Sequence, residues 1–282
     1  FPPIDEQKFI SSYLDKKITQ INSLVEKIQR KIEILKEKRT SLINHCVTKG
    51  LDPNISMKDS GVEWIGEIPS SWQSIRLGML GIFSSSGIDK KLKKDEVPVR
   101  MVNFTDLIKG RNYFSIQTGD KEYKKVTTSQ SKLNEHRLEK GDMVFIPSSE
   151  TYEDLGYSSL IDFDEMDIVY SYHIIRFRTT KSIYHYYKKY FINCHSVLNQ
   201  FSLQSKGTTR KIIGKNVFKN VRVVLPPIYE QQQIVSYLDK QTQLIDKTVS
   251  IEEKRIELFK EYRQSLISCV VTGKLKITEN KI

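Results

Sequence analysis

The chain has 282 residues, 38% of them hydrophobic, so it is long enough for one or two domains with a hydrophobic core, and wholesale disorder is not expected. It carries 45 Lys plus Arg against 34 Asp plus Glu, and the resulting net charge of +11 favours an anionic partner such as nucleic acid. The three cysteines form no CxxC pair, no apolar run approaches the roughly 18 residues of a membrane span, and no signal peptide is recognisable, which together predict a cytoplasmic protein with no membrane partner.

A segment near the start of the chain recurs near its end. The sequence PPIDEQKFISSYLDKK reappears as PPIYEQQQIVSYLDKQ, and the alignment continues without a gap through Arg39 and Arg263. The distance between the copies is far longer than the period of a solenoid, so one element is used twice around a different domain. The predicted organisation is a helical repeat over 1–48, a central domain over 49–224, and a second helical repeat with a C-terminal tail over 225–282.

Each copy of the repeat predicts one long helix. The Pro-Pro pair suits the entrance of a helix, and no further Pro or Gly occurs until Gly50 in the first copy and Gly273 in the second. A helix of about 44 residues would be roughly 65 Å long, and its apolar residues follow the four-three spacing of a coiled coil. The predicted interface residues are Leu14, Ile21, Val25, Ile28, Ile32, Leu35 and Leu42 in the first copy and Leu238, Ile245, Val249, Ile256, Phe259 and Leu266 in the second.

Polar residues interrupt this apolar stripe at a few positions. Arg39 and Arg263 occupy equivalent places in the two copies, and the second copy also has Thr242 and Glu252 on the stripe. Two interpretations of the arginines stay open, a polar contact that sets the register and a side chain that extends outward to solvent. The helices taken alone are typical of a structural or dimerising coiled coil, so we expect the specific function to lie between them.

The central domain is predicted to mix helices and strands. Its aromatic-rich segment is expected to form one amphipathic helix whose rings pack in a core. The predicted strands cover 97–104, 142–148, 168–178 and 217–225, and the predicted helix covers 183–201. The fold class is therefore α+β, a mixed α/β domain flanked by two long helices.

Two basic loops of the central domain suit contact with phosphates. The loop IDKKLKK at 88–94 follows the small residues SSSG, and the loop SKGTTRKIIGK at 205–215 combines glycine, hydroxyls and cations. Hydroxyls and backbone N–H groups position a duplex through its phosphates, whereas Arg and Lys also read base edges in the major groove. Arg210 is the first candidate for such a contact. Composition alone favours solvated loops without a ligand over a phosphate-binding role.

A nucleic-acid-binding chain of this size could be a nuclease, a methyltransferase or a motor, and each of these enzymes needs catalytic motifs. The sequence has no GxxxxGK[ST], HExxH or GxSxG motif, and its five histidines show no metal-ligand spacing. The segments FPPI and LPPI lack the polar first residue with which amino-methyltransferases hold a target base. The sequence therefore predicts no catalytic residue and no metal site.

The order of motifs along the chain is typical of one known family. PPIxEQ, YLDK, KEKRTSLINHCVTKGLDP and KDSGVEWIGEIPSSW are followed by SSGIDKK, VPVRMVNFTDL, GDMVFIPSSETYEDLGYSSLI and KGTTRKIIGKNVFKNVRVVLPP. Together they cover nearly the whole chain, which resembles the specificity (S) subunit of type I restriction-modification systems. That family has the order domain, helix, domain, helix, with the helices paired antiparallel. Because this sequence reads helix, domain, helix, we expect either the second half of a full subunit or a separately encoded half-subunit with one target-recognition domain.

The resemblance implies a DNA-recognition role without catalysis. The central domain would bind one half of a bipartite site in double-stranded DNA, and the helices would set the spacing and dock the methyltransferase (M) subunit. The M subunits would methylate adenine at N6, and the restriction (R) subunits would join through the complex and cleave DNA. No cofactor is then expected on this chain, because S-adenosylmethionine, ATP and Mg would be bound by the partner subunits. Two such chains could also form a homodimer through their helices.

The resemblance also places particular residues near DNA. The family's recognition loops correspond here to SSGIDKK, SSETYEDL and KGTTRK, in which Glu150 either accepts a hydrogen bond from cytosine N4 or braces its loop. The DNA-binding residues expected in these loops are Lys90, Lys91, Ser149, Glu150, Thr151, Lys206, Thr208, Thr209, Arg210 and Lys211. Two alternatives stay open, an assembly scaffold with weak DNA affinity on its own and a coiled-coil oligomerisation protein with an unrelated central domain.

Overall fold

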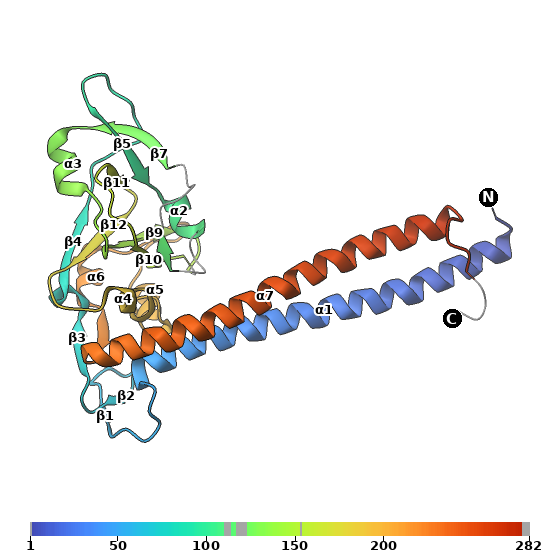
Figure 1. Ribbon diagram of the computed structural model, residues 1–282, viewed down its shortest axis with the longest axis horizontal. Coiled ribbons are helices and arrows are strands. Elements are labelled where there is room, and N and C mark those ends of the chain that lie inside the picture. Colours follow the sequence, from blue (N-terminus) through green and yellow to red (C-terminus); the bar gives the residue numbers. More distant parts are fainter. Residues whose placement is uncertain (1, 110–113, 117–122, 153, 278–282) are drawn as a thin grey trace. The chain divides into compact units, whose positions relative to one another are not determined.

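The computed structural model describes residues 2–109, 114–116, 123–152 and 154–277. The chain divides into two compact units, unit 1 formed by Phe1–Arg39 with Lys240–Ile282, and unit 2 formed by Thr40–Asp239. Two long helices, α1 (Ile4–Lys49) and α7 (Ile228–Val271), each pass from one unit into the other (Figure 1). The two helices predicted from the repeat are therefore confirmed, and unit 2 includes the last turns of α1 and the first turns of α7.

The repeated sequence produces the same start in both long helices. Gln7 Nε2 donates a hydrogen bond of 2.8 Å to Pro2 O, and Gln231 Nε2 donates one of 2.8 Å to Pro226 O at the equivalent place. The chain leaves both helices at a glycine with positive φ, +83° at Gly50 and +71° at Gly273. A residue in this left-handed conformation ends a helix, and glycine adopts it without the strain that a Cβ would cause.

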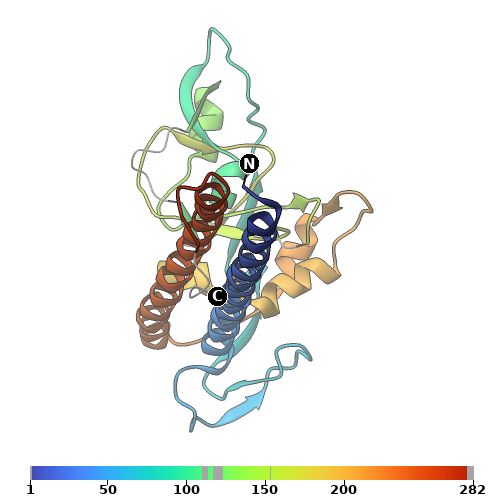
Figure 2. The ribbon, with the colours of Figure 1, turned by 90° about the vertical axis from the view of Figure 1, so that its right-hand side faces the viewer.

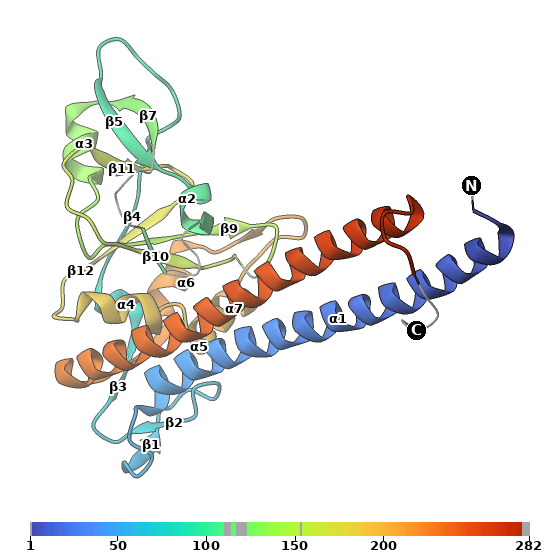
Figure 3. The ribbon, with the colours of Figure 1, turned by 45° about the vertical axis from the view of Figure 1, so that its right-hand side comes forward.

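In unit 1 the two helices pack against each other as an antiparallel pair. Leu14 and Ile21, near the start of α1, form a buried cluster with Leu266 and Val270, near the end of α7. Further along, Lys31 Nζ lies 2.6 Å from Glu252 Oε1. Residue numbers rise along α1 as those of their partners fall along α7, and the two helices lie side by side in Figure 3. The predicted pairing of the two copies is thereby confirmed.

The two repeat-equivalent arginines make equivalent contacts across this pair. Arg39 Nε lies 2.9 Å from Asp246 Oδ1, and Arg263 Nη1 donates a hydrogen bond of 2.7 Å to Asn22 Oδ1. Asn22 and Asp246 are themselves equivalent positions of the repeat. The structure therefore supports the interpretation in which each arginine makes a polar contact that sets the register of the helix pair.

The residues predicted for the helix interface are buried or half-buried. Leu42 and Leu238 pack in the core of unit 2 instead of between the helices of unit 1, because both helices run into that unit. The remaining residues belong to unit 1. Of these, Leu14, Ile21, Ile28, Ile32, Ile245, Val249, Ile256 and Leu266 are buried, and Val25, Leu35 and Phe259 are half-buried.

Unit 2 is built around two sheets with more than two strands. The larger has the order β4–β12–β8–β10–β6, antiparallel except for the parallel pair β10–β6. Its strands are β4 (Gly81–Ser85), β12 (Ile175–Thr179), β8 (Met143–Phe145), β10 (Ser158–Ile161) and β6 (Ser115–Ile116). The smaller has the order β11–β5–β7, with strands β11 (Ile168–Tyr170), β5 (Val97–Val102) and β7 (Lys124–Thr128).

Two-stranded ribbons and short helices complete unit 2. The ribbons pair β1 (Met57–Asp59) with β2 (Glu67–Pro69), β3 (Gln73–Arg76) with β14 (Arg222–Leu225), and β9 (Ser148–Ser149) with β13 (Lys211–Ile212). The short helices are the 3-10 helix η1 (Leu77–Met79) and the α-helices α2 (Phe104–Lys109), α3 (Gln130–His136), α4 (His185–Phe191), α5 (His195–Leu203) and α6 (Lys215–Asn220).

Several predicted elements of the central domain are wrong in extent. The predicted strand 168–178 is two strands in different sheets, β11 and β12, separated by a turn in which Ile174 N donates to Ser171 O. The predicted strand 217–225 begins as helix α6 and becomes strand β14 only at Arg222. The predicted helix 183–201 is divided into α4 and α5. Each break depends on contacts with distant segments, which local periodicity does not report.

Asn193 shows how one such break is held. It lies between α4 and α5, where its Oδ1 accepts hydrogen bonds from Ser158 N at 2.9 Å and Ser158 Oγ at 3.1 Å. Its Nδ2 donates to Ser158 O at 2.8 Å. The side chain thus pairs with the Ser158 backbone as a neighbouring strand would, at the break between α4 and α5. The aromatic residues Tyr187, Tyr190 and Phe191 of α4 are buried, so the prediction that this segment packs in a core is confirmed.

We predict that Asn193→Ala destabilises unit 2 by about 1–3 kcal/mol, because it leaves the buried backbone N–H and C=O of Ser158 without their partners. The measurement is chemical denaturation followed by circular dichroism. The control is Asn134→Ala on the exposed face of α3, expected to change the unfolding free energy by less than about 0.5 kcal/mol. Equal stability of the two variants would contradict the role given to Asn193.

Candidate nucleic-acid interface

Two of the three predicted DNA-binding segments lie side by side. Strand β9 pairs with β13 in antiparallel register, with Ser149 opposite Lys211 and Ser148 opposite Ile212. The ribbon continues through a hydrogen bond of 2.8 Å from Ile213 N to Pro147 O. Residues 149–151 and 206–211, which are distant in sequence, are therefore neighbours.

The segment 206–212 closes as a narrow loop that presents polar residues to solvent. Lys206 and Ile212 exchange two backbone hydrogen bonds, of 3.0 and 2.8 Å. Gly207 has a φ of +110°, and a Cβ at this position would lie 2.2 Å from Arg210 O, so the turn requires glycine. Thr208, Thr209 and Arg210 are exposed at its tip, and the segment after α5 extends from unit 2 in Figure 2.

The cationic side chains of this loop lie over the segment that follows β9. Arg210 Nε donates a hydrogen bond of 2.7 Å to Ser148 Oγ. Lys211 Nζ donates one of 2.6 Å to Gly207 O and lies 5.0 Å from the centroid of the exposed Tyr152 ring. Among the described residues these contacts use few of the donors of each cation, and the other N–H groups of the guanidinium and the ammonium can contact phosphate oxygens.

The predicted residues near Thr151 have two different environments. Ser149 is buried, and its hydroxyl accepts a hydrogen bond of 3.2 Å from Thr151 N. Thr151 Oγ1 donates one of 2.9 Å to Asp154 Oδ2, which shapes the turn. Glu150 is exposed. Ser149 therefore shapes the loop, while Glu150 and Thr151 lie at its surface.

The third predicted segment, at 88–94, contacts the turn between β11 and β12. Tyr172 N donates a hydrogen bond of 3.2 Å to Ile88 O, next to the exposed residues Lys90 and Lys91. Burial lowers the pKa of the His173 imidazole, and the positive charges of Lys90 and Arg210 lower it further. Lys90 and Arg210 come from different loops, and the positive charges of both act on the His173 side chain of this turn.

Sequence reasoning missed the residues at the centre of this arrangement. Tyr172 and His173 form an exposed pair of rings with centroids 3.8 Å apart, and Tyr152 is exposed beside Lys211. Exposed aromatic rings among cations are typical of nucleic-acid-binding surfaces. The segment 168–178 was predicted as one continuous strand, which hid the turn. The only local signal was that its alternation of apolar and polar residues ends near His173.

Other titratable groups of unit 2 have structural roles. Burial raises the pKa of the Cys46 thiol to about 11 and lowers that of the Lys188 ammonium to about 8. Lys188 Nζ donates hydrogen bonds to Gly141 O and, at 3.2 Å, to Thr179 Oγ1. Within the described residues no group of three His, Cys, Asp or Glu side chains is arranged to hold a metal ion.

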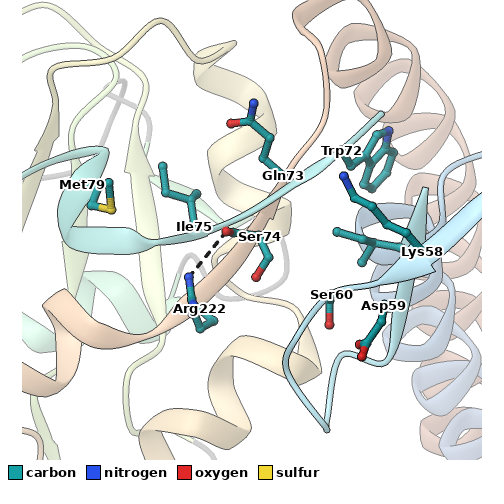
Figure 4. A pocket seen from close by; sticks show the side chains of 10 residues that line it. Lys58, Asp59, Ser60, Trp72, Gln73, Ser74, Ile75, Met79 and Arg222 are labelled. Atoms are coloured by element: carbon teal, nitrogen blue, oxygen red, sulfur yellow. Dashed lines mark hydrogen bonds between the residues drawn. The ribbon is translucent and has the colours of Figure 1, made fainter. Parts of the chain in front are cut away.

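The loops at 88–94, 149–151 and 206–211 are together called the loop cluster. One pocket of about 500 Å³ lies apart from it, between the β1–β2 and β3–β14 ribbons (Figure 4). Its charged lining residues are Lys58, Asp59 and Arg222. The carboxylate of Asp59 offsets part of the positive charge, and Arg222 Nη1 makes a long hydrogen bond of 3.5 Å to Ser74 O. The pocket shares no residue with the loop cluster, which remains the more strongly basic of the two sites.

Comparisons with known proteins identify the class to which this arrangement belongs. Residues 69–260 match the family model described as the type I restriction modification DNA specificity domain, which covers most of unit 2 and part of α7. The chain therefore belongs to this family, as its motifs predicted. No helix among the described residues is long and apolar enough to cross a membrane.

Individual relatives agree with the family. The chain is 24% identical to the type I restriction enzyme EcoKI specificity subunit of Escherichia coli K12, over 97% of this chain and 57% of the relative. It is 23% identical to the MjaVIII specificity subunit of Methanocaldococcus jannaschii, over 98% of this chain and 61% of the relative. The chain thus spans less than two thirds of the length of these relatives.

A solved structure supports the fold. It comes from work on complex assembly and conformational transition of the type I R-M system, and its fold matches this chain with a TM-score of 0.70 at 15% sequence identity. The match covers 98% of this chain and 61% of that chain. The α+β class with two long helices is therefore confirmed.

The convergence of the loops on His173 can be tested by titration. We predict that Lys90→Ala and Arg210→Ala each raise the His173 pKa towards its ordinary value of about 6.5, because each removes a positive charge that disfavours the imidazolium. The measurement is an NMR pH titration of the imidazole resonances. His136 is the internal control, because its pKa is lowered mainly by burial and neither substituted residue contributes. An unmoved His173 would show that the two loops are not neighbours.

Proposed function

We propose that unit 2 is a target-recognition domain that binds one half of a bipartite site in double-stranded DNA. The observation that carries this proposal is the convergence of three exposed segments, around Lys90, Thr151 and Arg210, on the Tyr172–His173 turn. Each segment is anchored to a sheet or ribbon of unit 2, so the cluster is presented on a rigid frame. Membership of the DNA specificity domain family supports the same conclusion.

The chemistry of the cluster suggests a division of labour. Lys90, Lys91 and Lys206 offer exposed ammonium groups to phosphates, and the hydroxyls of Thr208 and Thr209 offer hydrogen bonds. Arg210 and Glu150 carry groups that pair with base edges in the major groove, guanidinium with guanine and carboxylate with cytosine N4. The aromatic rings at Tyr152 and Tyr172 add apolar contact surfaces. Affinity would then come mainly from phosphate contacts and specificity from a few base contacts.

In this proposal the chain supplies recognition and no catalysis. The antiparallel helices of unit 1 act as a spacer and dock a methyltransferase subunit, which uses S-adenosylmethionine to methylate adenine at N6. Restriction subunits join through that complex and use ATP and Mg to cleave DNA, so none of these cofactors is bound by this chain. The relatives are themselves specificity subunits of type I restriction enzymes, which supports this assignment.

The bipartite site needs a second recognition domain. In a longer parent it would belong to the same chain, as the partial coverage of the relatives suggests, and the two half-sites would differ. In a half-subunit it would come from a second chain, and a two-fold homodimer would read a symmetric site. Because α1 and α7 already pair within one chain, such a homodimer would have to exchange helices or use another surface.

DNA selection tests the proposal directly. The chain, alone and with its cognate methyltransferase subunit, is mixed with a random-sequence DNA pool at several salt concentrations. The complex should enrich a short motif, and Arg210→Ala with Lys211→Ala should weaken binding and reduce the slope of log affinity against log salt by about 2. The matched control is Lys58→Ala with Arg76→Ala, which removes two exposed cations of other strands and should leave the selected motif unchanged.

Two results would contradict the proposal. If no motif is enriched although the methyltransferase subunit binds, the chain is an assembly scaffold. If the control pair weakens selection as much as the Arg210 pair does, the DNA-binding surface lies elsewhere on unit 2.

A further inference from the structure

The pocket between the β1–β2 and β3–β14 ribbons lies beside an unpaired edge of β3. Among the described residues β3 has one partner strand, β14. Leu77 N, which follows β3, donates a hydrogen bond of 2.8 Å to Val221 O. Since backbone groups alternate between the two edges of a strand, those of Gln73 and Ile75 also face β14, whereas those of Ser74 point to the opposite edge. Ser74 lines the pocket.

The backbone groups of Ser74 are little used by the rest of the chain. Ser74 O accepts a hydrogen bond of 3.5 Å from Arg222 Nη1, which is at the limit of such a bond (Figure 4). No hydrogen bond from Ser74 N to a described residue is formed across the register with β14 or in the turns around it. An unpaired edge of this kind is a template for another strand.

The other side of the pocket is formed by a second strand with an unpaired edge. Strand β1 is paired with β2 alone among the described residues. Ser60 N donates a hydrogen bond of 3.0 Å to Gly66 O, so the backbone groups of Lys58 and Ser60 face β2 and those of Asp59 face outward. The pocket of about 500 Å³ is thus bordered by residues of two strands that can each accept a neighbour.

The lining of the pocket differs between the two faces of β3. Arg222 is opposite Arg76 in the β3–β14 register, so Arg222 and Ser74 lie on the same face of this ribbon. Ile75 lies on the other face, and Met79, which is 60% exposed, lies beyond the end of β3. A strand placed along this edge would therefore meet a cation on one face and apolar side chains on the other.

The second cation of the pocket is Lys58, which shares a face of the β1–β2 ribbon with Ile68. The acidic residues nearby are Asp59, Glu63, Glu67 and Glu230. Asp59 and Glu67 are opposite each other, so both lie on the ribbon face away from Lys58. The Asp59 carboxylate accepts a hydrogen bond of 2.9 Å from Gly61 N, and Glu230 Oε2 accepts one of 2.8 Å from Trp72 Nε1. Glu63 lies in the turn beyond both strands.

From these observations we infer that the pocket binds an extended segment of another polypeptide, which adds as a strand along the free edge of β3. Successive side chains of a strand point to opposite faces, so the segment that fits carries acidic residues towards Lys58 and Arg222 and apolar residues towards Ile75 and Met79. Main-chain hydrogen bonds to Ser74 supply affinity, and this alternation supplies specificity. The inference goes beyond the proposed function and does not depend on it, because the pocket shares no residue with the loop cluster.

The test selects random heptapeptides displayed on phage against the immobilised full chain, without DNA. The enriched sequences should alternate Asp or Glu with apolar residues and lack internal Pro, because an added strand needs its backbone N–H groups. The most enriched sequence is then synthesised, and its affinity for the full chain is measured by isothermal titration calorimetry.

Two pairs of variants identify the binding edge. Ser74→Pro should weaken binding of the synthetic peptide at least about tenfold, because it removes the outward N–H while leaving the bonds to β14 in place. Its matched control, Ser74→Ala, keeps that N–H and should change the affinity less than about twofold. Lys58→Gln with Arg222→Gln should weaken binding about tenfold and reduce its dependence on salt, whereas Lys124→Gln with Lys125→Gln, exposed on β7, should not. Circular dichroism of each variant checks that the fold is kept.

Three outcomes would overturn the inference. The first is a selection that enriches no peptide, and the second is a peptide that binds the folded Ser74→Pro variant as tightly as the unaltered chain. The third is a Lys58 and Arg222 variant that binds the peptide normally but binds DNA more weakly, which would assign the pocket to the DNA-binding surface. The first two leave the proposed function standing, since DNA selection tests it separately.

Discussion

The burial of one apolar stripe along each long helix is the constraint on which the other features depend. An amphipathic helix of more than 40 residues is not stable unless that stripe is covered throughout. In unit 1 the two helices cover each other, as in the cluster of Leu14 and Ile21 with Leu266 and Val270. In unit 2 the same helices contribute Cys46 and Leu238 to the core of the mixed domain. Each long helix thus contributes residues to the cores of both units. The end of α1 and the start of α7 are buried in the core of unit 2.

The acidic residues of unit 2 form ion pairs with arginines of its sheets. Arg100 bonds Glu165 and Asp167, and it holds the pKa of the Asp167 carboxyl below its usual range. Arg178 likewise lies 2.7 Å from the buried carboxylate of Asp142. These acids come from the stretch of sequence that contains no Lys or Arg between Gly141 and Ile175. They neutralise arginines of the sheets. In the loop at 88–94 Lys91 and Lys93 lie near Asp89 and Glu96, whereas the ion pairs found among the described residues include none of Lys90, Arg210 and Lys211.

The sequence repeat makes the two helices of the pair similar, and the departures from the repeat make their contacts and surfaces different. The ion pair of Arg39 with Asp246 and the hydrogen bond of Arg263 to Asn22 join equivalent positions of the repeat and favour one register. Glu252 breaks the pattern, because its repeat equivalent is Ile28, and it contacts both Lys31 and Arg255. The exposed residues Leu244 and Ile251 of α7 depart from the repeat as well, because their equivalents on α1 are Gln20 and Lys27. A helix pair built from a repeated sequence therefore carries surfaces that differ between its two helices.

The sequence by itself determined the long helices, their partners and the chemical character of the loops. Pro-Pro entrances, glycine exits and the spacing of apolar residues are local signals, and the identity of Arg39 with Arg263 was visible in the repeat. The basic character of the loops near Lys90 and Arg210 was equally plain. Only the tertiary structure decided where the helix at Asn193 breaks, that Ser149 is buried, and that Tyr172 and His173 stand between two basic loops. These outcomes depend on contacts between segments far apart in the chain, such as β9 with β13, and no local periodicity encodes which distant backbone will satisfy a given hydrogen bond.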